Sequence, residues 1–261
     1  TIAPEQAVGL VPVSDDNKSK LVAKVDAFIA DLVAQDAASP EFGKRVDQLT
    51  NMGRKEIAAA AAMSNRFLDR PVRAMDKEAG VGANLAELRR TVEQLDPGKS
   101  GKLSKGRKLL GIIPFGNSLK NYFQGYQSAQ GHIQSILGHL ASGKDELLMD
   151  NAAIDVERQN LWKAMGDLEQ MVHISRTLDQ KLEDKANELD ATDPAKAKAI
   201  RESALFYVRQ RTQDLLTQMA VTVQGYLALD LDKKNNVELV KGVDRASTTT
   251  VGALRTAVTV A

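Results

Sequence analysis

The stretch that decides the fold runs from Asp145 to Ala191 and reads DELLMDNAAIDVERQNLWKAMGDLEQMVHISRTLDQKLEDKANELDA. Leucine or isoleucine recurs in it every seven residues, at Leu147, Ile154, Leu161, Leu168, Leu182 and Leu189. Only Ser175 interrupts the series, and Met165 and Val172 stand at half-heptad positions between its members. Such a repeat leaves one narrow apolar stripe along a helix, and a second helix covers that stripe best. We therefore predict a long helix in an antiparallel coiled-coil hairpin.

The partner helix is predicted to begin at Asp193-Pro194, because an aspartate N-cap followed by proline is a common helix start. Its own stripe consists of Leu205, Val208, Thr212, Leu215, Met219, Thr222, Tyr226, Leu229 and Asn236. The polar members are expected to fix the register of the two helices. A second apolar flank is formed by Leu216, Ala220, Val223 and Leu227. We expect a helix over residues 119–141 to cover this flank.

The predicted fold class is all-α, an elongated antiparallel coiled coil or bundle of long helices with a smaller N-terminal helical unit. We expect that unit over residues 1–97, a basic, glycine-rich hinge over 98–118 and a long-helix body over 119–261. Ser39-Pro40 predicts a helix start in the first part. Ser142-Gly143 can end the 119–141 helix, but the sequence does not decide whether it breaks the helix. The helical pattern runs to Val260-Ala261 without a capping residue, so we expect the sequence to be truncated at its C-terminus.

Composition excludes several kinds of chemistry. Aromatic residues make up 4% of the chain and charged residues 26%, which suits long helices better than sheets. The chain has no cysteine, and therefore no thiolate nucleophile, no cysteine-ligated zinc and no thiol to reduce an oxyanion. No segment resembles a signal peptide or a run of about 20 apolar residues. We expect a cytoplasmic protein.

A net charge of +1 hides a strongly basic segment. Residues 97–144 carry seven basic and no acidic side chains. Five of these cations directly precede an apolar run, namely Lys99, Lys102, Lys105, Arg107 and Lys108. They form a solvated linker or contact an anionic surface, such as the inner face of the membrane. A nucleic-acid partner is not expected, because no recognition fold accompanies the charge.

Arginines of the return helix are candidates for anion binding. Arg209 and Arg211, with Arg201 two turns earlier, could hold an oxyanion, since guanidinium groups match such anions in shape and charge. The alternative is that they form salt bridges to Asp or Glu of the opposite helix. Asp244 and Arg245 are candidates for an anion or partner contact, or for a simple surface pair.

No catalytic residue, metal site or cofactor is predicted. Gly98-Lys99-Ser100 is similar to the end of a phosphate-binding loop, but Glu93 stands where that loop has glycine. His132 and His139 lie about 10 Å apart along one helix, too far for one metal ion. No Ser/His/Asp set and no catalytic carboxylate pair is legible. We therefore predict that the chain is not an enzyme.

Several segments are characteristic of one bacterial family. They are YQSAQ (126–130), GKDELL (143–148), LFYVRQR (205–211), DLLTQ (214–218), QGYLALD (224–230), GVDRA (242–246) and TTTV (248–251). Together they resemble the TelA family of toxic-anion (tellurite) resistance proteins, from about Leu103 to Ala261 and less closely from Glu41 to Pro97. The resemblance implies a bacterial cytoplasmic protein tied to tellurite and envelope-stress resistance. It supplies no established catalytic residues.

From this resemblance we expect a non-enzymatic helical scaffold or adaptor in tellurite and envelope-stress resistance. The alternative is a protein that binds and sequesters the oxyanion directly. The expected partners are other proteins of a tellurium-resistance or stress system. A homo-oligomer is a further option, because a coiled-coil stripe is covered within one chain or between chains.

Overall fold

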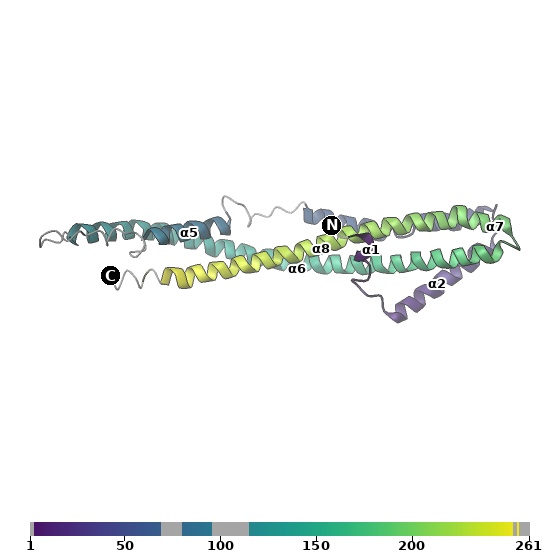
Figure 1. Ribbon diagram of the computed structural model, residues 1–261, viewed down its shortest axis with the longest axis horizontal. Coiled ribbons are helices and arrows are strands. Elements are labelled where there is room, and N and C mark those ends of the chain that lie inside the picture. The colour runs from purple at the N-terminus through teal and green to yellow at the C-terminus, as the bar shows by residue number, and fades with distance from the viewer. Residues whose placement is uncertain (1–2, 69–79, 96–114, 253–254, 256–261) are drawn as a thin grey trace. The chain divides into compact units, whose positions relative to one another are not determined.

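The computed structural model describes residues 3–68, 80–95, 115–252 and 255 (Figure 1). It is 90% helical, and these ranges contain no strand. The helices are α1 (Pro4–Ala7), α2 (Asp15–Ala34), α3 (Pro40–Asn51), α4 (Arg54–Leu68), α5 (Val81–Leu95), α6 (Phe115–Leu189), α7 (Pro194–Ala199), the π-helix η2 (Ile200–Leu205), α8 (Phe206–Arg245) and the π-helix η3 (Ala246–Thr250). The all-α prediction is confirmed, and the long helix α6 packs against the C-terminal helix α8.

The chain forms two compact units. The first unit comprises Thr1–Arg70 and Asp155–Asp230, and the second comprises Pro71–Ile154 and Leu231–Ala261. Both long helices contribute one part to each unit, while α1–α4 belong to the first unit and α5 to the second. This division differs from the sequential one expected from composition, because helices of this length run through both units.

The predicted helix starts are confirmed. Ser39 accepts a hydrogen bond from the backbone N–H of Phe42 at 3.1 Å, and Asp193 accepts one from Lys196 at 3.1 Å. A proline follows each cap at the first helical position, where no N–H is needed.

Ser142-Gly143 does not break the helix, because α6 continues through it from Phe115 to Leu189. A Cβ on Gly143 would come 2.5 Å from Cγ2 of Val81 on α5. The glycine therefore allows close packing of two helices of the second unit and does not mark a helix terminus.

The seven-residue stripe is buried as predicted, except that Leu189 at the end of α6 is only partly buried. Leu147, Ile154, Leu161, Leu168 and Leu182 expose 2% or less of their surface. Ser175, the interruption in the series, is fully buried, and its hydroxyl donates to the carbonyl of Val172 at 3.0 Å. The facing stripe of α8 is buried at Leu215, Met219, Thr222, Leu229 and Asn236.

The first unit has two apolar clusters. In one, α2 and α3 pack on α6 and on the start of α8; it includes Val25, Ile29, Leu32, Phe42, Val46, Leu49, Leu178, Leu182, Leu205 and Val208. In the other, Ala7 of α1 and Ala60 of α4 pack with Met165, Leu168, Leu215, Leu216, Met219, Ala220 and Val223.

The second flank of α8 is thus covered by α1 and α4, so its expected cover by residues 119–141 is wrong. Small alanine side chains let these helices approach closely, and Leu227 remains exposed.

In the second unit, α5 packs on the first part of α6 and the end of α8. The cluster contains Val81, Leu88, Leu95, Ile133, Ile136, Leu140, Leu147, Val243 and Val251. Asn236 is 2% exposed, and its Nδ2 donates to Asp150 at 2.9 Å and to Asn151 at 3.1 Å. A buried amide with specific partners favours one register of α6 against α8 over shifted ones.

In the described ranges, no helix is both long enough and apolar enough to cross a membrane.

Leu161→Asp should lower the free energy of unfolding by about 3–5 kcal/mol, because it places a charge in the buried stripe. Leu227→Asp makes the same substitution at a side chain that is 49% exposed on α8 and should change stability little. Urea unfolding followed by circular dichroism measures both. Equal losses for the two variants would contradict the assignment of the stripe as the core.

Gly53→Ala should destabilise the chain by about 1–3 kcal/mol. Gly53 has φ +72° between α3 and α4, and a Cβ there would come 2.8 Å from Cδ2 of Leu215. Gly43 lies inside α3, and a Cβ there would have no neighbouring atom within 4 Å. Gly43→Ala should therefore stabilise the chain by about 0.5–1 kcal/mol. Thermal unfolding of the two variants tests this; the same sign for both would contradict it.

Candidate functional site

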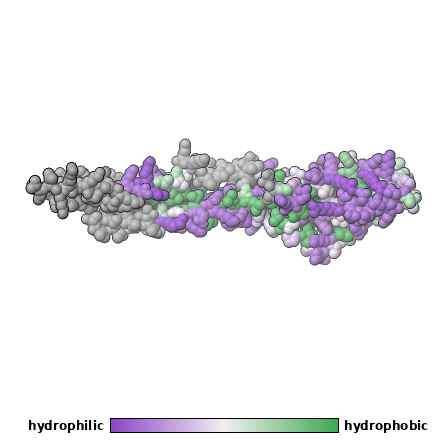
Figure 2. Space-filling model, in the orientation of Figure 1, coloured by the Kyte–Doolittle hydropathy of each residue, from purple (hydrophilic) through white to green (hydrophobic). Residues whose placement is uncertain are grey.

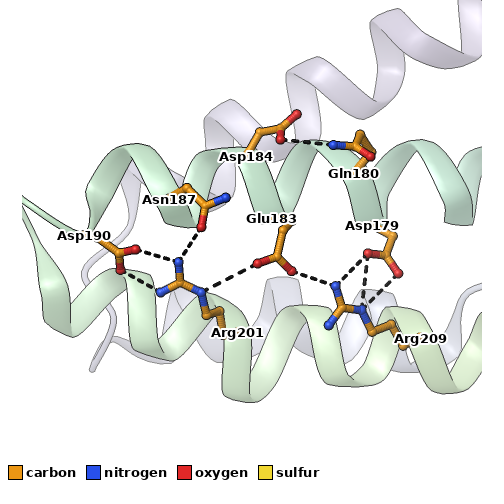
Figure 3. A network of polar contacts seen from close by, with 8 residues as sticks. All are labelled: Asp179, Gln180, Glu183, Asp184, Asn187, Asp190, Arg201 and Arg209. Atoms are coloured by element: carbon orange, nitrogen blue, oxygen red, sulfur yellow. Dashed lines mark hydrogen bonds and ion pairs between the residues drawn. The ribbon is translucent and has the colours of Figure 1, made fainter.

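Arg201, Arg209 and Arg211 lie in the first unit, where α6 ends and the chain returns through α7 and η2 into α8. Figure 3 shows Arg201 and Arg209 pointing across to carboxylates of α6. The surface at this end of the unit is largely hydrophilic (Figure 2). These side chains form an arginine–carboxylate network of Asp179, Glu183, Asn187, Asp190, Arg201 and Arg209.

Arg201 makes a two-pronged pair with one carboxylate. Its Nη1 and Nη2 donate to the two oxygens of Asp190 at 2.6 and 2.7 Å. Nη2 also donates to Oδ1 of Asn187 at 2.7 Å, and Nε lies 3.9 Å from Glu183. Arg201 stands in η2, directly after the short helix that Asp193 and Pro194 start. The tight return of the chain therefore brings this arginine back over the last turns of α6.

Arg209 makes the second pair of the network. Its Nε and Nη2 donate to Asp179 over distances of 2.9–3.2 Å, and Nη2 also donates to Oε2 of Glu183 at 2.7 Å. Glu183 therefore faces both guanidinium groups and joins the two pairs into one network. All members that accept from the arginines stand on α6 or in the turn that directly follows it.

The network is complementary in charge but open to solvent. Three carboxylates face two guanidinium groups. The hydrogen bonds from Arg201 hold the pKa of Asp190 below its usual range, and the hydrogen bonds that Arg209 donates to Asp179 and Glu183 raise the pKa of Arg209. Side chains of the two pairs are between 32% and 54% exposed, so each pair contributes modestly to stability. Together they specify how α8 aligns along α6.

In this arrangement carboxylates already occupy the guanidinium groups of both Arg201 and Arg209. An incoming oxyanion would have to displace carboxylates that the fold holds in place, and those carboxylates would repel it. The structure thus shows the salt bridges to the opposite helix that were the alternative to anion binding.

The other candidate residues do not join the network. Arg211 donates to the carbonyl of Met52 at 3.0 Å and pairs with Asp214 at 2.8 Å, which ties α8 to the end of α3. Asp244 and Arg245 belong to the second unit, where Asp244 pairs with Lys144 of α6 at 2.5 Å and Arg245 is exposed. Lys99, Lys102, Lys105, Arg107 and Lys108 lie outside the described residues.

Among the described residues, no group of three or more His, Asp or Glu side chains is arranged to hold a metal ion. His132 lies 3.2 Å from Glu87 of α5, a contact within the second unit.

The partners of the arginines in and directly after α6 are not identifiable residue by residue from the sequence. Asp179, Glu183, Asn187 and Asp190 follow at spacings of four, four and three residues, beside the buried Leu182. Charges that flank the stripe of a paired helix commonly meet the partner helix. The spacing of these side chains is visible in the sequence. Their arginine partners can be assigned only when the register of α8 against α6 is known.

Residues 39–261 match the model of a protein family described as toxic anion resistance protein (TelA). No curated protein and no solved structure matches the chain.

Arg201→Gln should raise the pKa of Asp190 toward the ordinary carboxyl range, because the hydrogen bonds from Arg201 are the main cause of its lowering. A carboxyl whose pKa is lowered by folding stabilises the folded chain above its unfolded pKa, and this contribution disappears as the pH falls through its folded pKa. The stability difference between parent and variant should therefore be present at neutral pH and shrink below about pH 4.

Urea unfolding at a series of pH values measures this difference. Lys198→Gln removes the same charge from a side chain that lies 3.8 Å from Glu202 and is 71% exposed, so its effect should be smaller. A difference between parent and Arg201→Gln that stays constant from neutral to acid pH would contradict the pairing with Asp190.

Proposed function

Because the chain belongs to the toxic anion resistance protein (TelA) family, we propose that it serves that resistance as a non-enzymatic scaffold. Membership of the family implies a role in resistance to toxic anions such as tellurite. In this proposal the two long helices act as a coiled-coil platform that presents helical surfaces to other proteins of the resistance system. Resistance would then depend on the assembly of these other proteins on the chain.

One observation carries the proposal: the arginine–carboxylate network uses its guanidinium groups internally. Arg201 and Arg209 are occupied by Asp190, Asp179 and Glu183, and Arg211 by Met52 and Asp214. These contacts align helices with one another. They favour a structural role for the arginines over direct sequestration of the oxyanion.

The packing of the long helices also supports a platform. A stripe buried along α6 and a buried Asn236 favour one register of the two long helices. Large apolar side chains are exposed on both units, for example Phe206 on the first and Met149 on the second. Such side chains are suitable contact points for partner proteins.

The proposal includes a place in the cell. We place the chain in the cytoplasm during envelope stress, held at the inner membrane surface by the basic segment that contains Lys99 and Lys108. The support is the sequence alone: five cations precede an apolar run, and charge combined with shallow insertion is a usual means of reversible membrane attachment.

Cross-linking in tellurite-exposed cells, followed by identification of the captured proteins, tests the scaffold proposal. The tagged parent chain should recover a reproducible set of proteins of the resistance system. Leu161→Asp, which breaks the buried stripe, should lose that set, because the platform would no longer be assembled. Arg209→Lys keeps the charge and should retain it. A folded parent chain that recovers nothing above the Leu161→Asp background would contradict the proposal.

A further inference from the structure

A hollow in the first unit has walls that are almost entirely apolar. It has a volume of about 250 Å³ and lies where α2 and α3 pack on α6. Figure 1 shows α2 lying at an angle to α6, so that the two helices separate toward the start of α2. Most of the side chains that line the hollow are apolar, and they include Val25, Phe28, Leu49, Met52, Ile174 and Leu178.

The backbone around the hollow is already hydrogen-bonded. Its residues lie in α2, α6 and α3, or directly at the end of α3, and groups inside a helix bond to one another. At the end of α3 the N–H of Met52 donates to the carbonyl of Leu49 at 3.2 Å, and the carbonyl of Met52 accepts from Arg211 at 3.0 Å. A peptide in the hollow would bury its own N–H and C=O groups without partners, whereas an alkyl chain has no such groups.

Two polar side chains line the mouth of the hollow, and both can donate hydrogen bonds. They are the exposed Lys24 of α2 and the exposed Gln48 of α3. Among the described residues, neither has a hydrogen-bond or ion-pair partner. Asp26, the carboxylate nearest to Lys24 along α2, pairs with Lys181 of α6. The lining contains no carboxylate, so an unpaired ammonium beside an amide favours an anionic group at the mouth.

The volume sets the length of the guest. An apolar cavity of about 150 Å³ holds benzene with its six carbon atoms, so a hollow of this size accommodates roughly ten carbon atoms. Val25, Leu49 and Leu178 each expose 4% or less of their surface, so this part of the wall is firmly packed. A chain of about this length with one anionic end matches both the apolar walls and the donors at the mouth.

We propose that this hollow binds a medium-chain fatty acid. The alkyl chain lies against Phe28, Leu49 and Ile174, and the carboxylate accepts hydrogen bonds from the ammonium of Lys24 and the amide of Gln48. This site goes beyond the scaffold function and does not depend on it, because none of its residues belongs to the arginine–carboxylate network.

Methyl NMR of the full chain, labelled with 13C at the methionine methyl groups, tests the site. Met52 lines the hollow, whereas Met149 belongs to the second unit, is 67% exposed and serves as an internal control. Sodium decanoate, added below the concentration at which it forms micelles, should shift the Met52 signal saturably and leave the Met149 signal in place.

Two further probes separate the contributions of chain and charge. Butyrate has the same charge as decanoate and a shorter chain, so it buries less apolar surface. Decyltrimethylammonium has a chain of the same length and the opposite charge, so Lys24 repels it. Each should bind at least about tenfold more weakly than decanoate, as measured by the shift of the Met52 signal.

Lys24→Gln should weaken binding of decanoate about threefold or more, because the carboxylate loses its counter-charge. Lys18→Gln is the matched control: it removes the same charge from α2, at a side chain that pairs with Asp15 at 3.5 Å and does not line the hollow. This control should bind decanoate as the parent chain does.

No saturable shift of Met52, a parallel shift of Met149, or equal binding by the parent and Lys24→Gln would overturn the inference. Decyltrimethylammonium that binds as tightly as decanoate would also overturn it, because the mouth would then not select an anion. Tighter binding of the peptide Ac-Gly-Leu-Leu-OH would assign the hollow to a peptide C-terminus and overturn it as well. Each result can occur while the parent chain still captures resistance proteins, so the site can fail without the scaffold proposal.

Discussion

Burial of the seven-residue stripe of α6 is the constraint on which the rest of the structure depends. An apolar side chain at every seventh position stays exposed unless a second helix follows the same line, and α8 supplies that helix. The apolar faces that α6 and α8 do not cover for each other are covered by other helices of each unit. In the first unit α1–α4 pack on it, and in the second unit α5 does so.

Polar groups divide between the inside and the edge of this packing. Ser175, Thr222 and Asn236 interrupt the apolar contacts. The two hydroxyls bond within their own helices, for example Thr222 to the carbonyl of Gln218 at 2.8 Å, whereas Asn236 bonds across to Asp150 and Asn151 of α6. Charged groups lie at the edge, where Arg201 and Arg209 meet the acidic side of α6. The buried polar groups favour one register of α6 against α8, and the charged groups at the edge reinforce that register. The arginines are thus understood most simply as part of the helix pairing.

The stripe, the helix starts and the all-α class could be predicted because they depend on local spacing and capping. The role of Ser142-Gly143 could not be decided from the sequence, since a glycine that allows α5 to approach is indistinguishable there from one that ends a helix. The cover of Leu216 and Val223 by α1 and α4 also could not be predicted, because it depends on contacts between segments distant in the chain. For the site, the arginines were recognisable from their type, whereas their α6 partners required the register of the pair.

The most direct measurement of the central claim is NMR observation of the side-chain Nε–Hε groups of Arg201 and Arg209 while tellurite is added to the folded chain. The account predicts that both signals stay at their positions, because carboxylates of α6 and its following turn already occupy the guanidinium groups. Saturable shifts of both signals at one tellurite per chain would contradict it and would identify the network as an anion site.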